Sequence, residues 1–392
     1  MTLSSVSVFV PRDEDRPRLV ELPWWCGAAA TAEPRRFLGL FPQSSATPLY
    51  HMDGLAKAIG VAGLYVKDES TRFNLSSFKA LGGAYAVFRV AHRIAEARLG
   101  RSVDPRELLK PEIRALMAGL TVCCASDGNH GRSVAYGARL IGAVCKVFLH
   151  SGVSAERVSH IERQGASIVR INGSYDESVN AARDAAAAED WTLVPDITAP
   201  EDKDGALICG FVMEGYSILV DEILTEAERE GVRFTHVFVQ AGVGGLAASV
   251  FGHWAARQRH VPFFVVVEPD LAPCLLESAR KGEPVTLEHN HPTIMAMLEC
   301  QRPSPLAWPI VHALADAYVS VSEEDARSAV KKLAWPHGAD PTIEAGESGA
   351  AGLAGVMTAL RTPGAIEGLG AGATVLVLST EGPTDRSVWS GR

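Results

Sequence analysis

Short apolar runs alternate with amphipathic segments along the chain from about residue 60 onward. The apolar runs predict strands at Leu64–Lys67, Leu120–Ala125, Val144–Leu149, Ser167–Ile171, His236–Gln240, Phe263–Val267, Tyr318–Val321 and Thr374–Leu378. Apolar residues at helical spacing predict helices at Phe78–Ala97, Gly131–Ile141, Ala155–Gln164, Tyr175–Ala188, Met213–Glu230, Leu246–Ala256 and Glu323–Leu333. Near-continuous apolar strands that alternate with helices are typical of parallel sheets covered on both faces.

The predicted strands are too many for one simple α/β half. We therefore expect an α/β protein with two open, mostly parallel twisted sheets flanked by helices. Residues 1–45 show no clear period and predict an irregular N-terminal extension. Residues 46–80 and 200–392 are assigned to a large domain, and residues 81–199 to a smaller α/β domain. Ligands of such sheets bind beyond the carboxyl ends of the strands.

The composition is that of an ordinary globular protein, with 392 residues, 47% hydrophobic and 21% charged. A net charge of −9 without a dense Lys/Arg cluster argues against nucleic-acid binding. No apolar run is long enough to cross a membrane, and the first residues lack a signal-peptide pattern. The seven cysteines are odd in number and contain no C-x-x-C pair. We therefore expect reduced thiols, a cytoplasmic location and no metal site.

Lys79 opens a predicted helix in the segment Ser76–Tyr85, which reads SSFKALGGAY. An ammonium group in the first turn of a helix lies near the positive end of the helix dipole, which favours the neutral amine. A neutral lysine amine can form a Schiff base with a carbonyl cofactor. The alternative interpretation is a solvated lysine in a first helical turn.

Two turns between a predicted strand and a predicted helix could bind anions. Ser126–Gly131 reads SDGNHG, and Gln240–Leu246 reads QAGVGGL. Backbone N–H groups exposed at such turns can hold a carboxylate or a phosphate. The glycine loop also resembles loosely the dinucleotide-binding pattern, with Glu268 as the acid that follows it. A nucleotide-binding or regulatory protein therefore stays open as an alternative.

The last predicted strand ends at Ser379 and Thr380, where a hydroxyl group could contact a bound ring. Together, the four segments resemble in their order the fold-type II pyridoxal-5′-phosphate (PLP) enzymes, whose fold is that of the tryptophan synthase β subunit. Within them the similarity is to the diaminopropionate ammonia-lyases. The matching stretches run from about residue 35 to residue 386 and are TPL, KDES-x-RF, FK-x-LGGAYA, DGNHG, QAGVG, VEPD, TIMA, GESGA-x-GL and LSTEG-x-TD.

The resemblance implies a role for each segment. Lys79 would carry the cofactor and act as a base at the α-carbon of the substrate. Asn129 would donate a hydrogen bond to the hydroxyl group on the cofactor ring. Ser379 or Thr380 would face the ring nitrogen. The cofactor phosphate would be held in the large domain by Gly242, Val243, Gly244 and Gly245. The substrate would be bound by Ser77, Ser126, Asp127, Gly128 and Asp196.

Two acids imply more specific chemistry. By the same resemblance, Asp127 is a second base on the face opposite Lys79, which would let the enzyme accept both enantiomers. Asp196 matches an acid that binds the amino substrate, although a solvated loop acid or a helix cap is the alternative. After Asp196 the family pattern Thr-Ala-Trp-Glu-Gly-Tyr is replaced by charged residues in the segment 197–205, which puts the substrate in question more than the reaction class.

The predicted function is PLP-dependent α,β-elimination on a small amino acid, with 2,3-diaminopropionate giving pyruvate and ammonia. The alternative within the same fold is Ser/Thr dehydration, β-replacement or racemisation. The resemblance also implies a homodimer.

Overall fold

A computed structural model describes residues 7–12, 16–17, 21–27, 29–126, 128–198, 201–258, 260–288, 291–386 and 389–391. The chain divides into two compact units. Unit 1 contains Met1–Ala28, Ala46–Thr71 and Leu219–Arg392, and unit 2 contains Ala29–Ser45 and Arg72–Ile218. The domain boundaries predicted from the sequence, after residues 80 and 199, stay a prediction.

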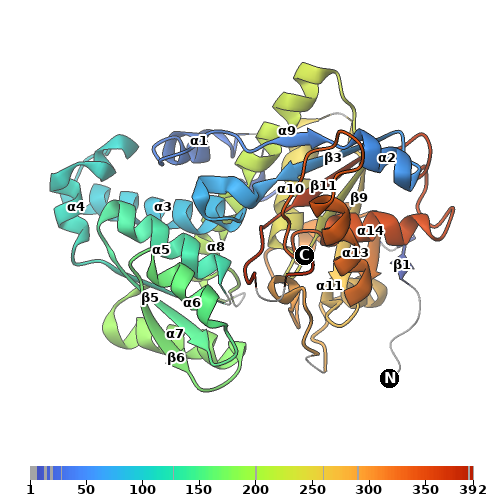
Figure 1. The fold of residues 1–392 in the computed structure, drawn as a ribbon. Coiled ribbons are helices and arrows are strands. Elements are labelled where there is room, and N and C mark those ends of the chain that lie inside the picture. Colours follow the sequence, from blue (N-terminus) through green and yellow to red (C-terminus); the bar gives the residue numbers. More distant parts are fainter. Residues whose placement is uncertain are drawn as a thin grey trace. The chain divides into compact units, whose positions relative to one another are not determined.

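Unit 1 is built on a seven-stranded sheet in the order β1-β10-β9-β8-β11-β3-β2. Figure 1 labels four of these strands, β1, β3, β9 and β11. Its strands are β1 (Val8–Phe9), β2 (Leu49–His51), β3 (Gly63–Asp68), β8 (His236–Gln240), β9 (Phe263–Pro269), β10 (Ala317–Val321) and β11 (Thr374–Ser379). The five central strands run parallel, whereas β1 and β2 are antiparallel edge strands. The central strands are buried, so their carboxyl ends can present side chains at one edge of the sheet.

The helices of unit 1 cover this sheet. They are α2 (Asp53–Ile59), α9 (Ser217–Glu230, with its first two residues in unit 2), α10 (Gly245–Arg257), α11 (Cys274–Lys281), α12 (Trp308–Leu314), α13 (Glu323–Ala334) and α14 (Ala351–Leu360), with the 3-10 turns η2 (Trp24–Cys26) and η5 (Ala296–Leu298). A core cluster joins α2, α13 and α14 to the apolar side chains of β3, β8, β9, β10 and β11. The 3-10 segment η3 (Glu69–Asn74) contains the break from unit 1 to unit 2.

Unit 2 contains a parallel four-stranded sheet in the order β6-β5-β4-β7. Its strands are β4 (Thr121–Ala125), β5 (Val144–His150), β6 (Ser167–Ile171) and β7 (Thr192–Leu193). Its helices are α1 (Ala32–Leu38), α3 (Lys79–Leu99), α4 (Pro111–Met117), α5 (Asn129–Ile141), α6 (Ala155–Glu162), α7 (Tyr175–Glu189) and α8 (Lys203–Gly215), with the 3-10 turn η4 (Pro105–Leu109). The first residues of α3 and α5 are therefore Lys79 and Asn129, two of the predicted site residues.

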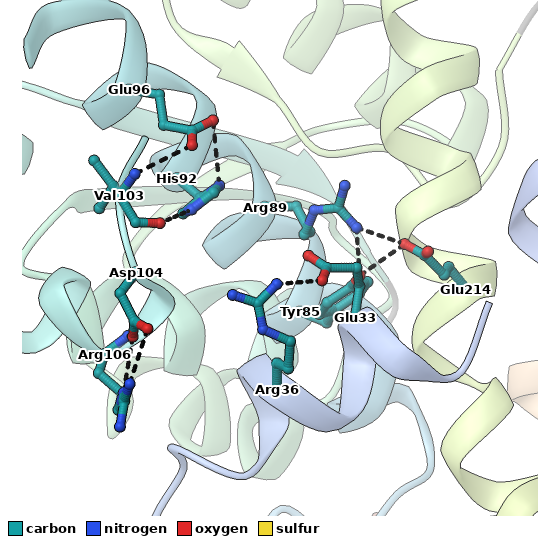
Figure 2. A network of polar contacts seen from close by, with 10 residues as sticks. All are labelled: Glu33, Arg36, Tyr85, Arg89, His92, Glu96, Val103, Asp104, Arg106 and Glu214. Atoms are coloured by element: carbon teal, nitrogen blue, oxygen red, sulfur yellow. Dashed lines mark hydrogen bonds and ion pairs between the residues drawn. The ribbon is translucent and has the colours of Figure 1, made fainter. Parts of the chain in front are cut away.

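Helices α3 and α8 pack closely because glycines face the contact. A Cβ atom on Gly82 would lie 2.6 Å from the Tyr216 ring, and one on Gly215 would lie 2.3 Å from the Leu81 carbonyl oxygen. A buried polar network reinforces this pair of helices (Figure 2). Tyr85 Oη donates a hydrogen bond to Glu214 Oε2 over 2.7 Å, and Arg89 Nη1 donates to the same oxygen over 2.8 Å.

All eight predicted strands are confirmed to within two residues, and the fold class is confirmed. The single helix predicted at Met213–Glu230 is wrong, because the chain forms α8 up to Gly215 and starts α9 at Ser217. Helix α8 begins at Lys203, where the Asp202 side chain accepts a hydrogen bond from the Gly205 N–H and caps it. The N-terminal segment is not wholly irregular either, since it forms β1 and α1.

Candidate active site

Lys79 and Asp196 meet in unit 2, although they are 117 positions apart in the sequence. Lys79 is the first residue of α3, and its Nζ donates to Asp196 Oδ2 over 3.1 Å. The two side chains are 23% and 20% exposed. The carboxylate favours the charged ammonium, which opposes the neutral amine expected from the helix dipole. The interpretation of Asp196 as a solvated acid or a helix cap is wrong, because it forms this ion pair and Asp202 caps α8.

Burial alone would raise the pKa of Asp196, but the Lys79 ammonium lowers it to about 2. The carboxylate is therefore ionised across the physiological pH range. Tyr175 Oη donates to Asp196 Oδ1 over 3.5 Å. His130 Nε2 lies 2.8 Å from the Val194 carbonyl oxygen, two positions before Asp196 in the chain. Burial lowers the pKa of His130, so its ring is neutral near pH 7.

The turn before α5 holds the second group of predicted residues. Ser126 Oγ accepts hydrogen bonds from the backbone N–H groups of Gly128 at 3.0 Å and Gly131 at 2.8 Å. The Ser126 hydroxyl oxygen is thus occupied by the helix start, and Asn129 is buried as the first residue of α5. Gly128 has φ +150° and ψ −80°, a conformation that only glycine adopts without strain. Asp127 lies outside the described residues.

Helix α5 also binds the start of α3. Ser133 Oγ donates to the Lys79 carbonyl oxygen over 2.7 Å and accepts from the Ala84 N–H over 2.9 Å. Ser77, which is 2% exposed, accepts a hydrogen bond from the Lys79 N–H at 3.2 Å. The structure therefore places Ser77, Lys79 and the start of α5 in one contiguous region of unit 2.

The glycine loop in unit 1 connects β8 to α10. Its residues are Gly242, Val243, Gly244 and Gly245. Gly244 is the N-cap of α10 with φ +95°, and no side chain caps this helix start. A Cβ atom on Gly242 would lie 2.7 Å from Cys300 Sγ, so any other residue here would require its neighbour to shift. An uncapped N-terminus of a 13-residue helix, formed by glycine backbone, is suited to bind an anion.

The two hydroxyl groups at the end of β11 have different surroundings. Thr380 Oγ1 accepts a hydrogen bond from Gln240 Nε2 over 3.0 Å. Ser379 Oγ is buried and forms no hydrogen bond of normal geometry in the described residues. It lies in register with Asp68 of the neighbouring strand β3. Burial raises the pKa of Asp68, an effect that contacts with Ser70 and the Ser379 hydroxyl only partly offset.

Glu268 does not support nucleotide binding. Its carboxylate accepts hydrogen bonds from the N–H groups of Leu275 and Leu276 at the start of α11, both at 2.8 Å. It is 1% exposed, and burial raises its pKa to about 8. A carboxylate in that position holds α11 in place and cannot reach a ribose.

Comparisons with known proteins agree with this arrangement. A family model described as "Pyridoxal-phosphate dependent enzyme" matches residues 40–381. The chain belongs to this family. It is 37% identical over 361 residues to the diaminopropionate ammonia-lyase of Escherichia coli (strain K12), a match that covers 88% of each chain.

Crystal structures of diaminopropionate ammonia-lyase from Escherichia coli are also similar. The complex with an aminoacrylate-PLP azomethine reaction intermediate has a TM-score of 0.84 and 33% identity, and the match covers 98% of this chain and 96% of that chain. The complex with D-serine has the same TM-score and coverage at 31% identity. The predicted family, cofactor and enzyme class, a PLP-dependent carbon–nitrogen lyase, are confirmed.

The residues present fit PLP on three observations. The start of α10 offers uncapped backbone N–H groups to a phosphate. The buried Ser379 hydroxyl needs a partner, which the ring nitrogen of PLP would supply. Lys79 is partly exposed and provides the primary amine that the aldehyde of PLP requires. Thr380, the other predicted residue at this position, already has Gln240 as its partner.

Sequence reasoning missed two residues of this region. Tyr175 contacts Asp196, and Gln240 contacts Thr380. Gln240 could have been found, because it is a polar residue at the end of the fully buried strand β8. Tyr175 gave no comparable signal, since a tyrosine at the start of a surface helix is common.

Among the described residues, no helix is both long and apolar enough to span a membrane.

Proposed function

We propose that this enzyme catalyses the α,β-elimination of 2,3-diaminopropionate to pyruvate and ammonia. The observation that carries the proposal is the contact between Lys79 Nζ and Asp196 Oδ2 at 3.1 Å. It places an ionised carboxylate next to the amine that a PLP enzyme uses for its chemistry. The similarity to diaminopropionate ammonia-lyase over most of the chain supports the choice of substrate.

PLP supplies an electron sink that acidifies the hydrogen on the substrate α-carbon. Lys79 would hold the cofactor, and its Nζ would take the proton from the α-carbon of the substrate. Asn129 would bind the hydroxyl group on the ring, Ser379 would pair with the ring nitrogen, and Gly242–Gly245 would bind the phosphate through backbone N–H groups.

Asp196 is the residue that we propose to bind the substrate's β-amino group. A carboxylate with a pKa of about 2 stays negative at neutral pH and attracts a second ammonium group. Binding the β-amino group as ammonium also prepares it to leave as ammonia, because no further proton is needed. The turn formed by Ser126, Gly128 and Asn129 would hold the α-carboxylate, and Ser77 would line the same region.

Asp127 is proposed as the base on the face opposite Lys79. A planar reacting centre exposes two faces, and one lysine reaches only one of them. With two bases the enzyme would act on both enantiomers. The complex of the Escherichia coli enzyme with D-serine supports the view that this family binds D-amino acids.

The segment after Asp196 leaves a second candidate function. Asp202 caps α8 and accepts a hydrogen bond from Thr198 Oγ1 over 3.1 Å, so this segment is organised by charged and polar residues in place of the family's aromatic ones. A different covering segment can change the preferred leaving group. Dehydration of serine or threonine, β-replacement and racemisation are therefore the competing reactions.

The test is pyruvate and ammonia release by the PLP-loaded enzyme from 2,3-diaminopropionate, compared with serine and threonine at equal concentration. We expect kcat/KM for diaminopropionate to exceed that for serine by about 100-fold, the selectivity that one well-placed charged contact provides. Equal or greater activity on serine would assign the enzyme to the dehydratases. Absence of any elimination product would overturn the reaction class.

We also infer that the enzyme is a cytoplasmic homodimer that does not bind nucleic acid. The seven cysteines form no disulfide bond among the described residues, and six of them are buried, which suits a reducing compartment. The homodimer rests on the family resemblance and would be tested by light scattering of the eluting peak in size-exclusion chromatography. A monomeric mass with full activity would overturn it.

A further inference from the structure

Gln240 is the last residue of β8, and it lies two positions before the glycine loop. Its side chain is buried, and Nε2 faces four acceptors in the described part of unit 1. These are the carbonyl oxygens of Ser348 at 3.1 Å, Gly349 at 2.8 Å and Leu378 at 3.0 Å, and Thr380 Oγ1 at 3.0 Å. An amide group has two hydrogens, so the four acceptors share them.

The surroundings fix the orientation of this amide. A carbonyl oxygen turned toward the three backbone carbonyls would face only lone pairs, so the NH₂ group must lie there. Gln240 Oε1 then points away and is buried without a hydrogen-bond partner among the described residues. An unmet buried acceptor is a cost to the folded protein. The Gln240 side chain therefore joins these segments, although its own Oε1 is left without a hydrogen bond among the described residues.

The segments joined by Gln240 are those assigned to the cofactor. Its backbone leads into Gly242–Gly245, and its side chain binds the positions on both sides of Ser379. The third segment that Gln240 contacts contains Ser348 and Gly349 and precedes α14. It is joined to the chain just after β11, because the Gly346 N–H donates to the Glu381 carbonyl oxygen over 2.9 Å. One buried amide therefore links the proposed phosphate-binding loop to the hydroxyl proposed for the ring nitrogen.

We propose that Gln240 is a positioning residue for PLP, which sets the distance between the Gly242–Gly245 loop and the Ser379 hydroxyl. This inference rests on the proposed function, in which those two groups bind the phosphate and the ring nitrogen. PLP is a rigid ring with its phosphate on a short arm, so both contacts form together only when the loop and the hydroxyl are correctly spaced. Gln240 acts on the cofactor through these groups.

The experiment is a double-mutant cycle on PLP affinity, measured by titrating cofactor-free protein with PLP and following absorbance. The variants are Gln240→Met, Ser379→Ala and the two combined. Gln240→Met keeps the size of the side chain but cannot donate, and it should weaken PLP binding about 10- to 100-fold. Because it also misplaces Ser379, the double variant should bind within about threefold of Gln240→Met alone. Gln258→Met, which changes an exposed glutamine after α10, should leave the affinity unchanged.

Losses that multiply in the double variant would overturn the inference, since the two residues would then act independently. An unchanged affinity in Gln240→Met would overturn it as well. Where Gln240→Met fails to fold, Gln240→Asn takes its place in the cycle, because it keeps a buried amide on a shorter side chain, and the same non-additivity is expected. Failure of the wild-type protein to bind PLP would instead reject the proposed function.

Discussion

The two helix starts that carry the predicted anion sites differ in how they satisfy their own backbone. Helix α5 begins with Ser126 Oγ accepting hydrogen bonds from two N–H groups of the turn. The N-cap of helix α10 is Gly244, which has no side chain to cap the helix start. The first turn of any α-helix has N–H groups that lack helical partners. In α5 the protein supplies part of what they need, whereas in α10 it leaves them for a ligand.

The two helix starts suit different anions. A phosphate carries several oxygens and more charge than a carboxylate, and it benefits from an open helix start made of glycine. A carboxylate needs fewer donors, and the partly occupied turn of α5 suits it better. The comparison therefore supports the proposal that the cofactor phosphate binds in unit 1 and the substrate carboxylate in unit 2.

The largest effect is expected at Lys79, which opens the helix next to the α5 turn. Lys79→Ala removes both the amine that holds PLP and the base at the α-carbon, so kcat for pyruvate release should fall about 10⁴-fold or more. Lys203→Ala is the matched control, because Lys203 is also the first residue of a helix but is exposed. Residual activity in Lys79→Ala within tenfold of wild type would contradict the assignment.

A substitution of Asp127 tests the proposed role of the turn before α5. Asp127→Asn is expected to lower kcat/KM for D-2,3-diaminopropionate by about 10²- to 10⁴-fold, the usual effect of losing a proton-transferring base. Activity on the L-enantiomer should stay within a few-fold of wild type, because Lys79 serves that face. The two enantiomers are assayed with the same preparation. Equal losses for both would show that Asp127 has a general structural role.

Two glycine substitutions test the comparison directly. Gly244→Asp adds bulk and negative charge at the open start of α10, so it should weaken PLP binding about 100-fold. Gly128→Ala strains the turn before α5, and it should raise KM for the amino acid about tenfold. Its PLP affinity should change by less than about threefold. Both variants are titrated with PLP and then assayed at saturating PLP. If Gly244→Asp mainly raised KM for the amino acid and Gly128→Ala mainly weakened PLP binding, the two proposed anion sites would have to be exchanged.

The smallest effect concerns the ion pair of Asp196. Its pKa is lowered from 3.8 to about 2 in the folded protein, so the pair stabilises the fold above about pH 4 and loses that contribution as the pH falls toward 2. Asp196→Asn should therefore lower the Tm of cofactor-free protein by about 2–4 °C at pH 6, for roughly 1 kcal/mol. The difference from wild type should shrink by pH 3. Asp204→Asn, at an exposed position in α8, is the control. A difference that grows as the pH falls would contradict the ion pair.

The central strands of unit 1 could be predicted from the sequence because each is a short, largely buried run of mostly apolar residues. Strands β1 and β2 were not predictable from apolar runs, since two or three residues carry no period and their pairing depends on distant strands. Helix α14 is buried nearly all round and shows no amphipathic pattern. Helix α8 contains three glycines, which hide its helical character, and its start depends on the Asp202 cap.

The site residues could be predicted from local segments of the sequence and from the family resemblance. The contacts between these residues could not be predicted in this way. Nothing in the segment around Lys79 points to Asp196, because Asp196 lies 117 positions later, between β7 and α8, and meets Lys79 only in the folded unit 2. The choice between Ser379 and Thr380 likewise needed the structure. It depends on Gln240, whose side chain binds the Thr380 hydroxyl, whereas the Ser379 hydroxyl forms no hydrogen bond of normal geometry among the described residues.

The most direct test of the account is the chemical position of the cofactor. Protein loaded with PLP is reduced with borohydride, digested and analysed by peptide mass spectrometry. The account predicts a pyridoxyl group on Lys79 at close to one per chain, and none on the exposed Lys203. Modification of a different lysine, or no modification in protein that is fully active, would contradict the account.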